Sequence, residues 1–124
     1  MRYMLLLHYA ELADEISEEA MAEGRAAFTS YAATLQAAGV LVAAEVLRPS
    51  AATTTVTRTE GALRIQDGPF AVTKEQLGGV FILEVPDLDA ALEWAQAAPA
   101  VSWGSVEIRP VATHTVDGVW VPSA

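Results

Sequence analysis

The order in which helical and extended patterns follow one another constrains this fold more than any single residue does. Extended and helical runs alternate as strand, helix, strand, hairpin, strand, helix and strand. Without the hairpin this order is βαββαβ, the split-βαβ or ferredoxin-like arrangement. The predicted fold class is therefore α+β, a ferredoxin-like βαββαβ with an inserted β-hairpin. The predicted strands are 3–8, 40–47, 53–59, 63–66, 80–85 and 105–109, and the predicted helices are 17–38 and a second between Asp87 and Ala98.

Both predicted helices have recognisable ends. Ser17 is an N-cap residue that precedes two glutamates, and Gly39 stands at the C′ position of the first helix. Ile16 and Met21 have the spacing of a hydrophobic staple at the N-terminus of that helix. Asp87 is the predicted N-cap of the second helix, whose apolar residues recur at intervals of three and four.

Two dipeptides predict tight turns. Glu60-Gly61 separates two runs of β-forming residues and closes the inserted hairpin. Asp117-Gly118 stands between β-branched residues near the end of the chain, which is a second hairpin signal. The predicted domain covers residues 1–111, and residues 112–124 form a tail that can hold a short hairpin.

The predicted sheet leaves one face without helices, and that face needs a cover. Hydrophobic residues make up 52% of the chain and charged residues only 19%, so the apolar share is higher than in an average soluble domain. A domain of 124 residues with this balance has more apolar surface than it can easily hide. We therefore expect a homodimer in which two sheets face each other.

The charge balance narrows the classes of partner. The net charge is −9 and the seven basic residues are scattered, which argues against nucleic acid and against an anionic membrane surface. The chain has no cysteine, so disulfides and thiolate metal sites are excluded. No apolar run approaches the roughly 20 residues that span a bilayer, and the N-terminal apolar run is too short for a signal peptide. A cytoplasmic location is expected.

Polar groups are concentrated around the corner Asp67-Gly68-Pro69-Phe70, between two predicted strands. Asp67 can orient a base, bind a substrate hydroxyl or act as a base, or it can stabilise the turn by accepting backbone N–H bonds. Gly68 suits a backbone shape that other residues avoid. Phe70 is interpreted as a plug, either in the core or at a subunit interface.

His8 is the predicted general base, because an imidazole titrates near neutrality. It ends the first strand, on the face that also carries Met4 and Leu6. The alternative is a hydrogen-bonded structural histidine. Lys74 is a predicted contact for an anionic ligand, with a solvated or paired charge as its alternative. The two histidines lack metal-ligand spacing, so neither a metal nor a cofactor is predicted.

Several motifs follow one another in order along residues 1–111. They are Tyr3-Met4-Leu5-Leu6, Ala38-Gly39-Val40-Leu41, Asp67-Gly68-Pro69-Phe70, Thr73-Lys74-Glu75-Gln76-Leu77-Gly78-Gly79, Leu92-Glu93-Trp94-Ala95 and Gly104-Ser105-Val106-Glu107-Ile108-Arg109-Pro110. With these motifs the chain resembles the YCII-related family, and more closely its DGPF-domain branch. The resemblance implies a ferredoxin-like fold and a dimeric α/β barrel, without a settled activity.

The resemblance also implies two kinds of role. Related YCII proteins have a proposed His–Asp pair with the histidine on the first helix, and one of them is a dehydrochlorinase. Here the helix 17–38 has no histidine. Phe28 and Tyr31 occupy that neighbourhood, so Tyr31 is a predicted ligand contact, and Asp67 is the counterpart of the acid. Other members of the branch accompany sigma factors of the extracytoplasmic-function type.

Three functional hypotheses follow. The first is a dimer that binds a small organic ligand or is enzyme-like, with no assignable reaction. The second is a non-catalytic regulatory or interaction module that partners such a sigma factor. The third is a cofactor-free lyase or dehydrochlorinase-like enzyme, with His8 as base, Asp67 as orienter or acid and Lys74 as anion contact. A cavity that brings His8 and Asp67 within hydrogen-bond reach would favour an enzyme.

Overall fold

The computed structural model describes residues 1–11 and 17–123. Its strands are β1 (Arg2–Tyr9), β2 (Leu41–Val46), β3 (Thr54–Thr59), β4 (Ala62–Asp67), β5 (Gln76–Glu84), β6 (Gly104–Pro110), β7 (Thr113–Val116) and β8 (Val119–Pro122). Its helices are α1 (Glu18–Ala37) and α2 (Leu88–Gln96), with the short 3₁₀ helices η1 (Ser50–Ala52) and η2 (Pro99–Ser102). The predicted staple depends on Ile16, which lies outside the described residues.

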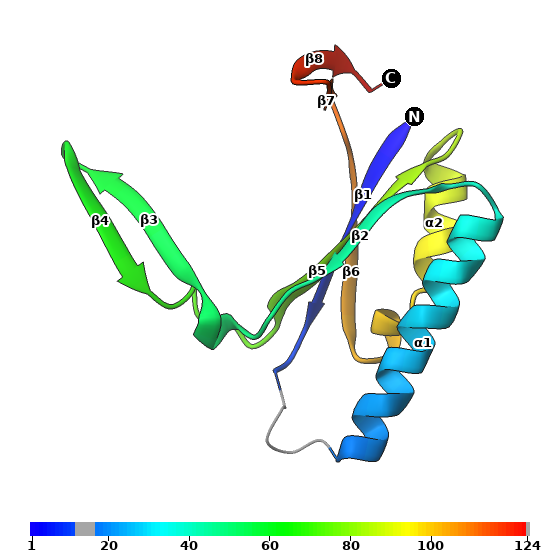
Figure 1. Cartoon of the computed structure of the whole chain (residues 1–124), viewed down its shortest axis with the longest axis horizontal. Helices are drawn as coiled ribbons and strands as arrows, with labels where there is room; N and C mark the ends of the chain where they lie inside the picture. Colours follow the sequence, from blue (N-terminus) through cyan, green and yellow to red (C-terminus); the bar gives the residue numbers. More distant parts are fainter. Residues whose placement is uncertain (12–16, 124) are drawn as a thin grey trace.

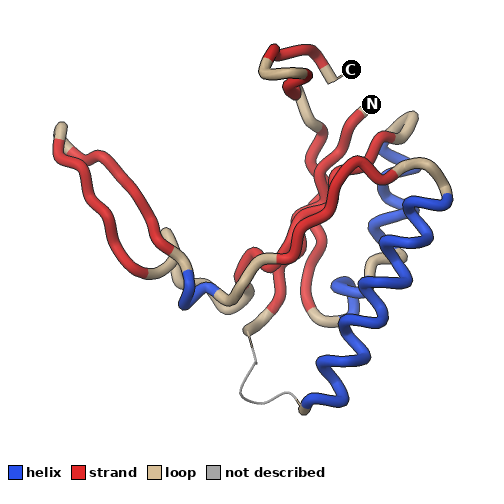
Figure 2. The backbone as a smooth tube through the Cα atoms, viewed as in Figure 1, coloured by secondary structure: helices blue, strands red, loops and turns tan. Residues whose placement is uncertain are grey.

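Four strands form the central sheet, in the order β2-β5-β1-β6, and each neighbouring pair is antiparallel. Both helices lie on one side of this sheet (Figures 1 and 2). The protein is therefore a mixed α+β structure, compatible with the ferredoxin-like fold that the element order predicts. We call the side of the sheet that carries no helix the open face.

The hydrophobic core lies between the central sheet and the helices. Strict alternation along β1 turns Leu5 and Leu7 toward the helices, while Met4 and Leu6 point to the open face. Leu83 of β5 and Leu35 of α1 complete the group of fully buried large side chains. Because β1 and β5 are the two inner strands, the core covers the middle of one face of the sheet.

Both helices begin and end as the sequence predicts. The Ser17 hydroxyl accepts a hydrogen bond from the Ala20 amide at 3.1 Å, and the Asp87 carboxylate accepts one from the Ala90 amide at 2.9 Å. Gly39 has a φ of +74°, the left-handed conformation of a C′ glycine. The N-cap and C′ predictions are confirmed.

The start of β5 differs from the prediction. The sequence placed the start of this strand at Val80, whereas the structure begins it at Gln76, so Gly78 and Gly79 lie inside the strand. The register of β1 against β5 shifts between Leu7 and His8 at the same point. Apolar patterning did not extend the strand back to Gln76, because close neighbours of Gly78 and Gly79 leave no room for side chains at these two positions.

Two hairpins stand outside the central sheet. In β3–β4 the turn residues Glu60 and Gly61 have φ values of +52° and +82°, and in β7–β8 Asp117 and Gly118 have +50° and +79°. Consecutive positive values identify the type I′ turn that suits a two-residue hairpin loop. The β3–β4 hairpin extends away from the central sheet on the side opposite the helices (Figure 1). We call this hairpin the arm.

No helix in the described part of the chain combines the length and the hydropathy required to cross a bilayer.

Candidate functional site

His8 lies at the C-terminal end of β1, on the open face, and it has a carboxylate partner. Its Nε2 atom is 2.6 Å from Oε1 of Glu107. The His8 side chain is 27% exposed and that of Glu107 is 55% exposed, so a molecule on the open face can reach both. A carboxylate in this position fixes the orientation of the imidazole ring and its tautomer.

Glu107 reaches His8 diagonally across the β1–β6 ladder. In that register Glu107 is opposite Leu6, and His8 is opposite Ser105. Diagonal neighbours are within reach of long side chains. Sequence reasoning missed Glu107 as a functional residue. Its place between Val106 and Ile108 shows that it faces away from the core, but the register that brings it to His8 cannot be read from either strand alone.

A second polar pair lies beside the first. The Ser105 hydroxyl donates a hydrogen bond of 3.1 Å to Oε1 of Glu75, the residue that precedes β5. Since β1 lies between β5 and β6, this bond passes over the end of β1 near His8. We call His8–Glu107 and Ser105–Glu75 together the polar pairs.

Apolar side chains cover the middle of the open face next to the polar pairs. Met4 is opposite Ile82 and Leu6 is opposite Val80 across the β1–β5 ladder, and all four side chains are half-buried. We call these four residues the open-face quartet. Arg109 of β6 is opposite Met4 on the same face and forms no ion pair with any described residue. The open face therefore combines an apolar centre, a histidine–glutamate pair and a cationic side chain.

Asp67 lies away from this site, as the last residue of β4 in the arm. It is opposite Thr54 and exposed. Backbone and threonine bonds hold the corner that follows: the Gly68 amide donates to the Thr53 carbonyl, and the Thr55 hydroxyl donates to the Gly68 carbonyl, both at 2.7 Å. No hydrogen bond joins Asp67 to His8 in the described part of the chain. The structure does not bring this predicted pair together within one protomer.

Tyr31 is a core residue. Its ring packs edge-on against Phe81, and its hydroxyl donates a hydrogen bond of 2.7 Å to the carbonyl of Trp94 in α2. Burial raises the pKa of Tyr31 to about 12. A ligand could accept a hydrogen bond from this hydroxyl only after displacing the bond that ties α1 to α2.

Lys74 lies in the segment between β4 and β5, where it is exposed and forms no ion pair with the described residues. Phe70 and Val72 of the same segment are 84% and 90% exposed. Phe70 is therefore not part of the core of this chain. The alternative interpretation, a plug at a subunit interface, remains a prediction.

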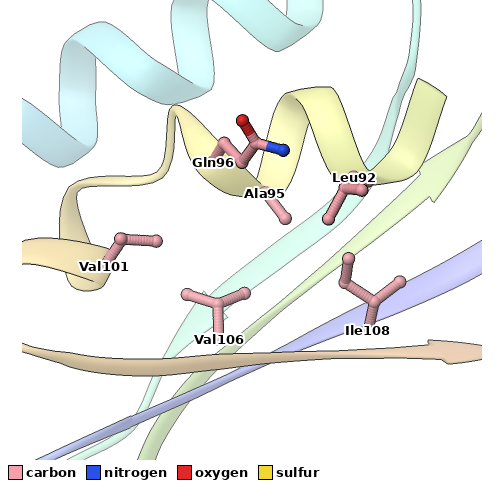
Figure 3. A pocket seen from close by; sticks show the side chains of 6 residues that line it. All are labelled: Leu92, Ala95, Gln96, Val101, Val106 and Ile108. Atoms are coloured by element: carbon pink, nitrogen blue, oxygen red, sulfur yellow. The ribbon is translucent and has the colours of Figure 1, made fainter. Parts of the chain in front are cut away.

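An apolar cavity of about 290 Å³ lies on the other side of β6 from the polar pairs. It opens between α2, η2 and β6, and its lining residues are Leu92, Ala95, Gln96, Val101, Val106 and Ile108 (Figure 3). None of the predicted site residues belongs to it. With Gln96 as its polar lining residue, this cavity offers no titratable group for catalysis.

Comparisons with known proteins found a family match and a relative. A YCII-related domain matches residues 1–115. An uncharacterized protein of Rhizobium meliloti (strain 1021) is 41% identical over 81 residues, which is 62% of this chain. The match spans 64% of that relative, less than two thirds of its length. Neither similarity carries an assigned reaction. Because the domain match covers nearly the whole chain, this protein belongs to the YCII-related family.

Proposed function

We propose that this protein is a homodimer that binds a small organic acid on the open face, with His8 and Glu107 as a proton-transfer pair. The contact between His8 and Glu107 carries the proposal, because it places a base and its orienting carboxylate on a solvent-accessible face. The corner Asp67-Gly68-Pro69-Phe70 supports placing the chain in the DGPF-domain branch of the family.

The homodimer is supported by the composition of the open face. The open-face quartet is apolar, whereas Glu45, Glu107 and Arg109 on the outer strands are polar. An apolar centre within a polar rim is the usual anatomy of a protein interface. Two such faces packed together would form the dimeric α/β barrel. The polar pairs, at one end of β1, would then line the mouth of that barrel.

The chemistry follows from the atoms of His8. With its proton on Nε2, the imidazole donates to Glu107 and presents the lone pair of Nδ1. No hydrogen bond from the described residues reaches Nδ1. This nitrogen can accept a proton from an acidic C–H or O–H group, and the Glu107 carboxylate stabilises the resulting imidazolium. A proton transfer of this kind requires no cofactor.

In this proposal Arg109 is the residue that makes the site select an anionic ligand. The carboxylates of Glu75 and Glu107 repel an anion, whereas the guanidinium of Arg109 can bind a carboxylate in a bidentate manner. Arg109 lies two residues beyond Glu107 on β6, a spacing of roughly 7 Å along the strand. We therefore favour Arg109 over Lys74 as the anion contact, because Lys74 lies outside the central sheet.

The test is a panel of small carboxylic acids and phenols screened by thermal shift, followed by calorimetry on each compound that binds. A ligand of the native state raises the melting temperature. We expect His8→Gln, Glu107→Gln and Arg109→Gln to reduce affinity for the same compound by about tenfold or more. Lys74→Gln is the matched control and leaves the affinity unchanged.

Two results would contradict the proposal. A compound whose affinity depends on Lys74 and not on Arg109 would place the anion contact in the segment between β4 and β5. A panel without any binding compound would favour the non-catalytic, regulatory hypothesis instead. Light scattering on the wild-type protein measures its mass in solution and tests the homodimer independently of any ligand.

A further inference from the structure

One side of the arm carries apolar side chains that no described residue covers in a single chain. Val56 is opposite Ile65 and Arg58 is opposite Leu63, so Val56, Ile65 and Leu63 lie on the same side of the hairpin. Thr54, Arg58 and Asp67 lie on that side as well. These three side chains are between 56 and 68% exposed. The other side carries polar residues such as Thr57, Arg64 and Gln66. We call Val56, Leu63 and Ile65 the arm strip.

An isolated hairpin of this kind requires a partner. The arm forms its own two-stranded sheet, separate from the central sheet. Two-stranded hairpins are only marginally stable in water unless a hydrophobic face packs on another surface. Phe70 and Val72, the most exposed large apolar residues in the described part of the chain, follow shortly after the arm. The strip and these two residues together form a surface typical of an interface.

The segment that contains the arm differs in charge from the rest of the chain. Four of the seven basic residues but only two of the sixteen acidic residues lie between positions 48 and 74. This segment carries a net charge of +2, whereas the whole chain carries −9. Within the arm Arg58 and Arg64 are balanced by Glu60 and Asp67, so the excess positive charge comes from the flanking residues Arg48 and Lys74. The remainder of a second copy is strongly acidic and attracts these two flanking residues. The open face itself presents Glu45, Glu75 and Glu107.

We infer that the arm of one protomer reaches across the dimer and packs its strip on the open-face side of a second copy. The arm and the open face lie on the same side of the central sheet in one chain (Figure 1). A second copy seated on the open face would therefore lie next to the arm of the first. The inference rests on the homodimer proposed above, and it adds an interaction surface that is distinct from the sheet.

Paramagnetic relaxation measured between the two chains tests this placement. The chain contains no cysteine, so Glu60→Cys at the tip of the arm provides a unique site for a spin label. Mixed dimers are prepared from two kinds of chain: spin-labelled chains at natural isotope abundance, and ¹⁵N-labelled chains that carry no spin label. We expect broadening at amides of the central sheet in the ¹⁵N chain, and none with a diamagnetic label. Broadening confined to the second arm, or its absence from mixed dimers, would overturn the inference.

A variant with a polar strip gives an independent measure. We expect Val56→Thr, Leu63→Thr and Ile65→Thr together to raise the dimer dissociation constant by at least about tenfold. Threonine retains β-propensity, and the two helices should keep their circular dichroism. The matched control, Thr57→Ser with Arg64→Lys, alters the opposite side of the arm and leaves dissociation unchanged.

The outcomes separate the inference from the proposal on which it rests. A wild-type protein that is monomeric by light scattering removes the homodimer and the arm contact together. If the wild type is a stable dimer and the strip variant has the same dissociation constant, the arm contact is wrong but the homodimer is not. Retained ligand binding by that dimer would leave the proposed site on the open face intact.

Discussion

The phenol ring of Tyr9 occupies the space that a side chain on Gly78 would need. The Tyr9 hydroxyl donates a hydrogen bond of 3.1 Å to the Gly78 carbonyl, and a Cβ atom built on Gly78 would overlap the ring. Trp103 packs against the same ring in an edge-on arrangement, with centroids 6.4 Å apart. Tyr9 therefore closes one end of the sheet, and the absence of a side chain at position 78 permits it to do so.

Gly78→Ala tests this relationship through protein stability. The added methyl group must displace the Tyr9 ring, and overpacking of this kind typically costs about 1 to 3 kcal/mol. We expect the free energy of unfolding to fall by that amount in urea titration. The double variant Tyr9→Ala with Gly78→Ala should be more stable than the sum of the two single effects predicts, because the clash is then absent.

Gly24→Ala is the matched control for that substitution. A Cβ atom at Gly24 in α1 would meet only the Trp103 ring, at an ordinary contact distance of 3.7 Å. Alanine is a better helix former than glycine by up to about 1 kcal/mol. The control should therefore be neutral or stabilising. Equal destabilisation by both variants would show that the Tyr9 contact is not responsible.

Tyr31 makes stability depend on pH at the alkaline end. Burial raises the pKa of Tyr31 from 10.0 to about 12 in the folded protein. Folding therefore favours the neutral phenol. Tyr31 contributes fully to the free energy of unfolding below pH 10, and this contribution is lost as the pH rises toward 12. The linkage amounts to about 2 to 3 kcal/mol in the free energy of unfolding. Urea titrations across this pH range measure it.

Tyr31→Phe identifies the residue responsible. The variant loses the bond to the Trp94 carbonyl, which costs about 1 to 2 kcal/mol at neutral pH. Its stability should then fall less steeply than that of the wild type above pH 10. An unchanged slope would mean that another group dominates the alkaline transition.

Local signals in the sequence predicted the local parts of this fold well. Ser17 and Asp87 have the side chains of N-caps, and the structure uses both. Asp117-Gly118 encodes its own positive φ values, and so does Glu60-Gly61. Caps and turns are readable because each depends on a few adjacent residues. The element order then led to the α+β class through general topology rules.

Long-range relationships could not be predicted in the same way. Glu107 meets His8 from 99 positions away, and only the β1–β6 register determines that contact. Gly78 interrupts the apolar pattern of β5 because the ring of Tyr9, far away in the sequence, fills the space of its side chain. Nothing in β3 or β4 specifies that the arm carries Asp67 away from the central sheet. Such features depend on packing geometry, which one-dimensional periodicity does not contain.

The His8–Glu107 contact should contribute little to stability. Exposed polar contacts to a carboxylate are worth about 0 to 1 kcal/mol, because solvent screens the attraction. We expect His8→Gln and Glu107→Gln each to change the free energy of unfolding by less than about 1 kcal/mol, and a double-mutant cycle to give a coupling energy in the same range. Both variants are then folded and suitable for binding measurements. A loss of several kcal/mol would instead assign the pair a structural role.

Glu11 links the end of β1 to the segment that leads into the arm. Its carboxylate accepts hydrogen bonds of 2.6 Å from the backbone amide and from the hydroxyl of Ser50 in η1. Burial raises the pKa of Tyr9, and the negative charge of Glu11 raises it further. Glu11→Gln removes the charge but keeps an oxygen acceptor for Ser50.

We therefore expect Glu11→Gln to lower the pKa of Tyr9 while leaving it above 10.0, because burial is the larger cause. NMR titration of ring-labelled tyrosines measures this value residue by residue. Glu93→Gln, an exposed change of the same kind on α2, is the control and leaves Tyr9 unchanged. An equal shift in both variants would indicate an effect of net charge. No shift in Glu11→Gln would mean that Glu11 is not electrostatically coupled to Tyr9, and its role would then be to hold Ser50.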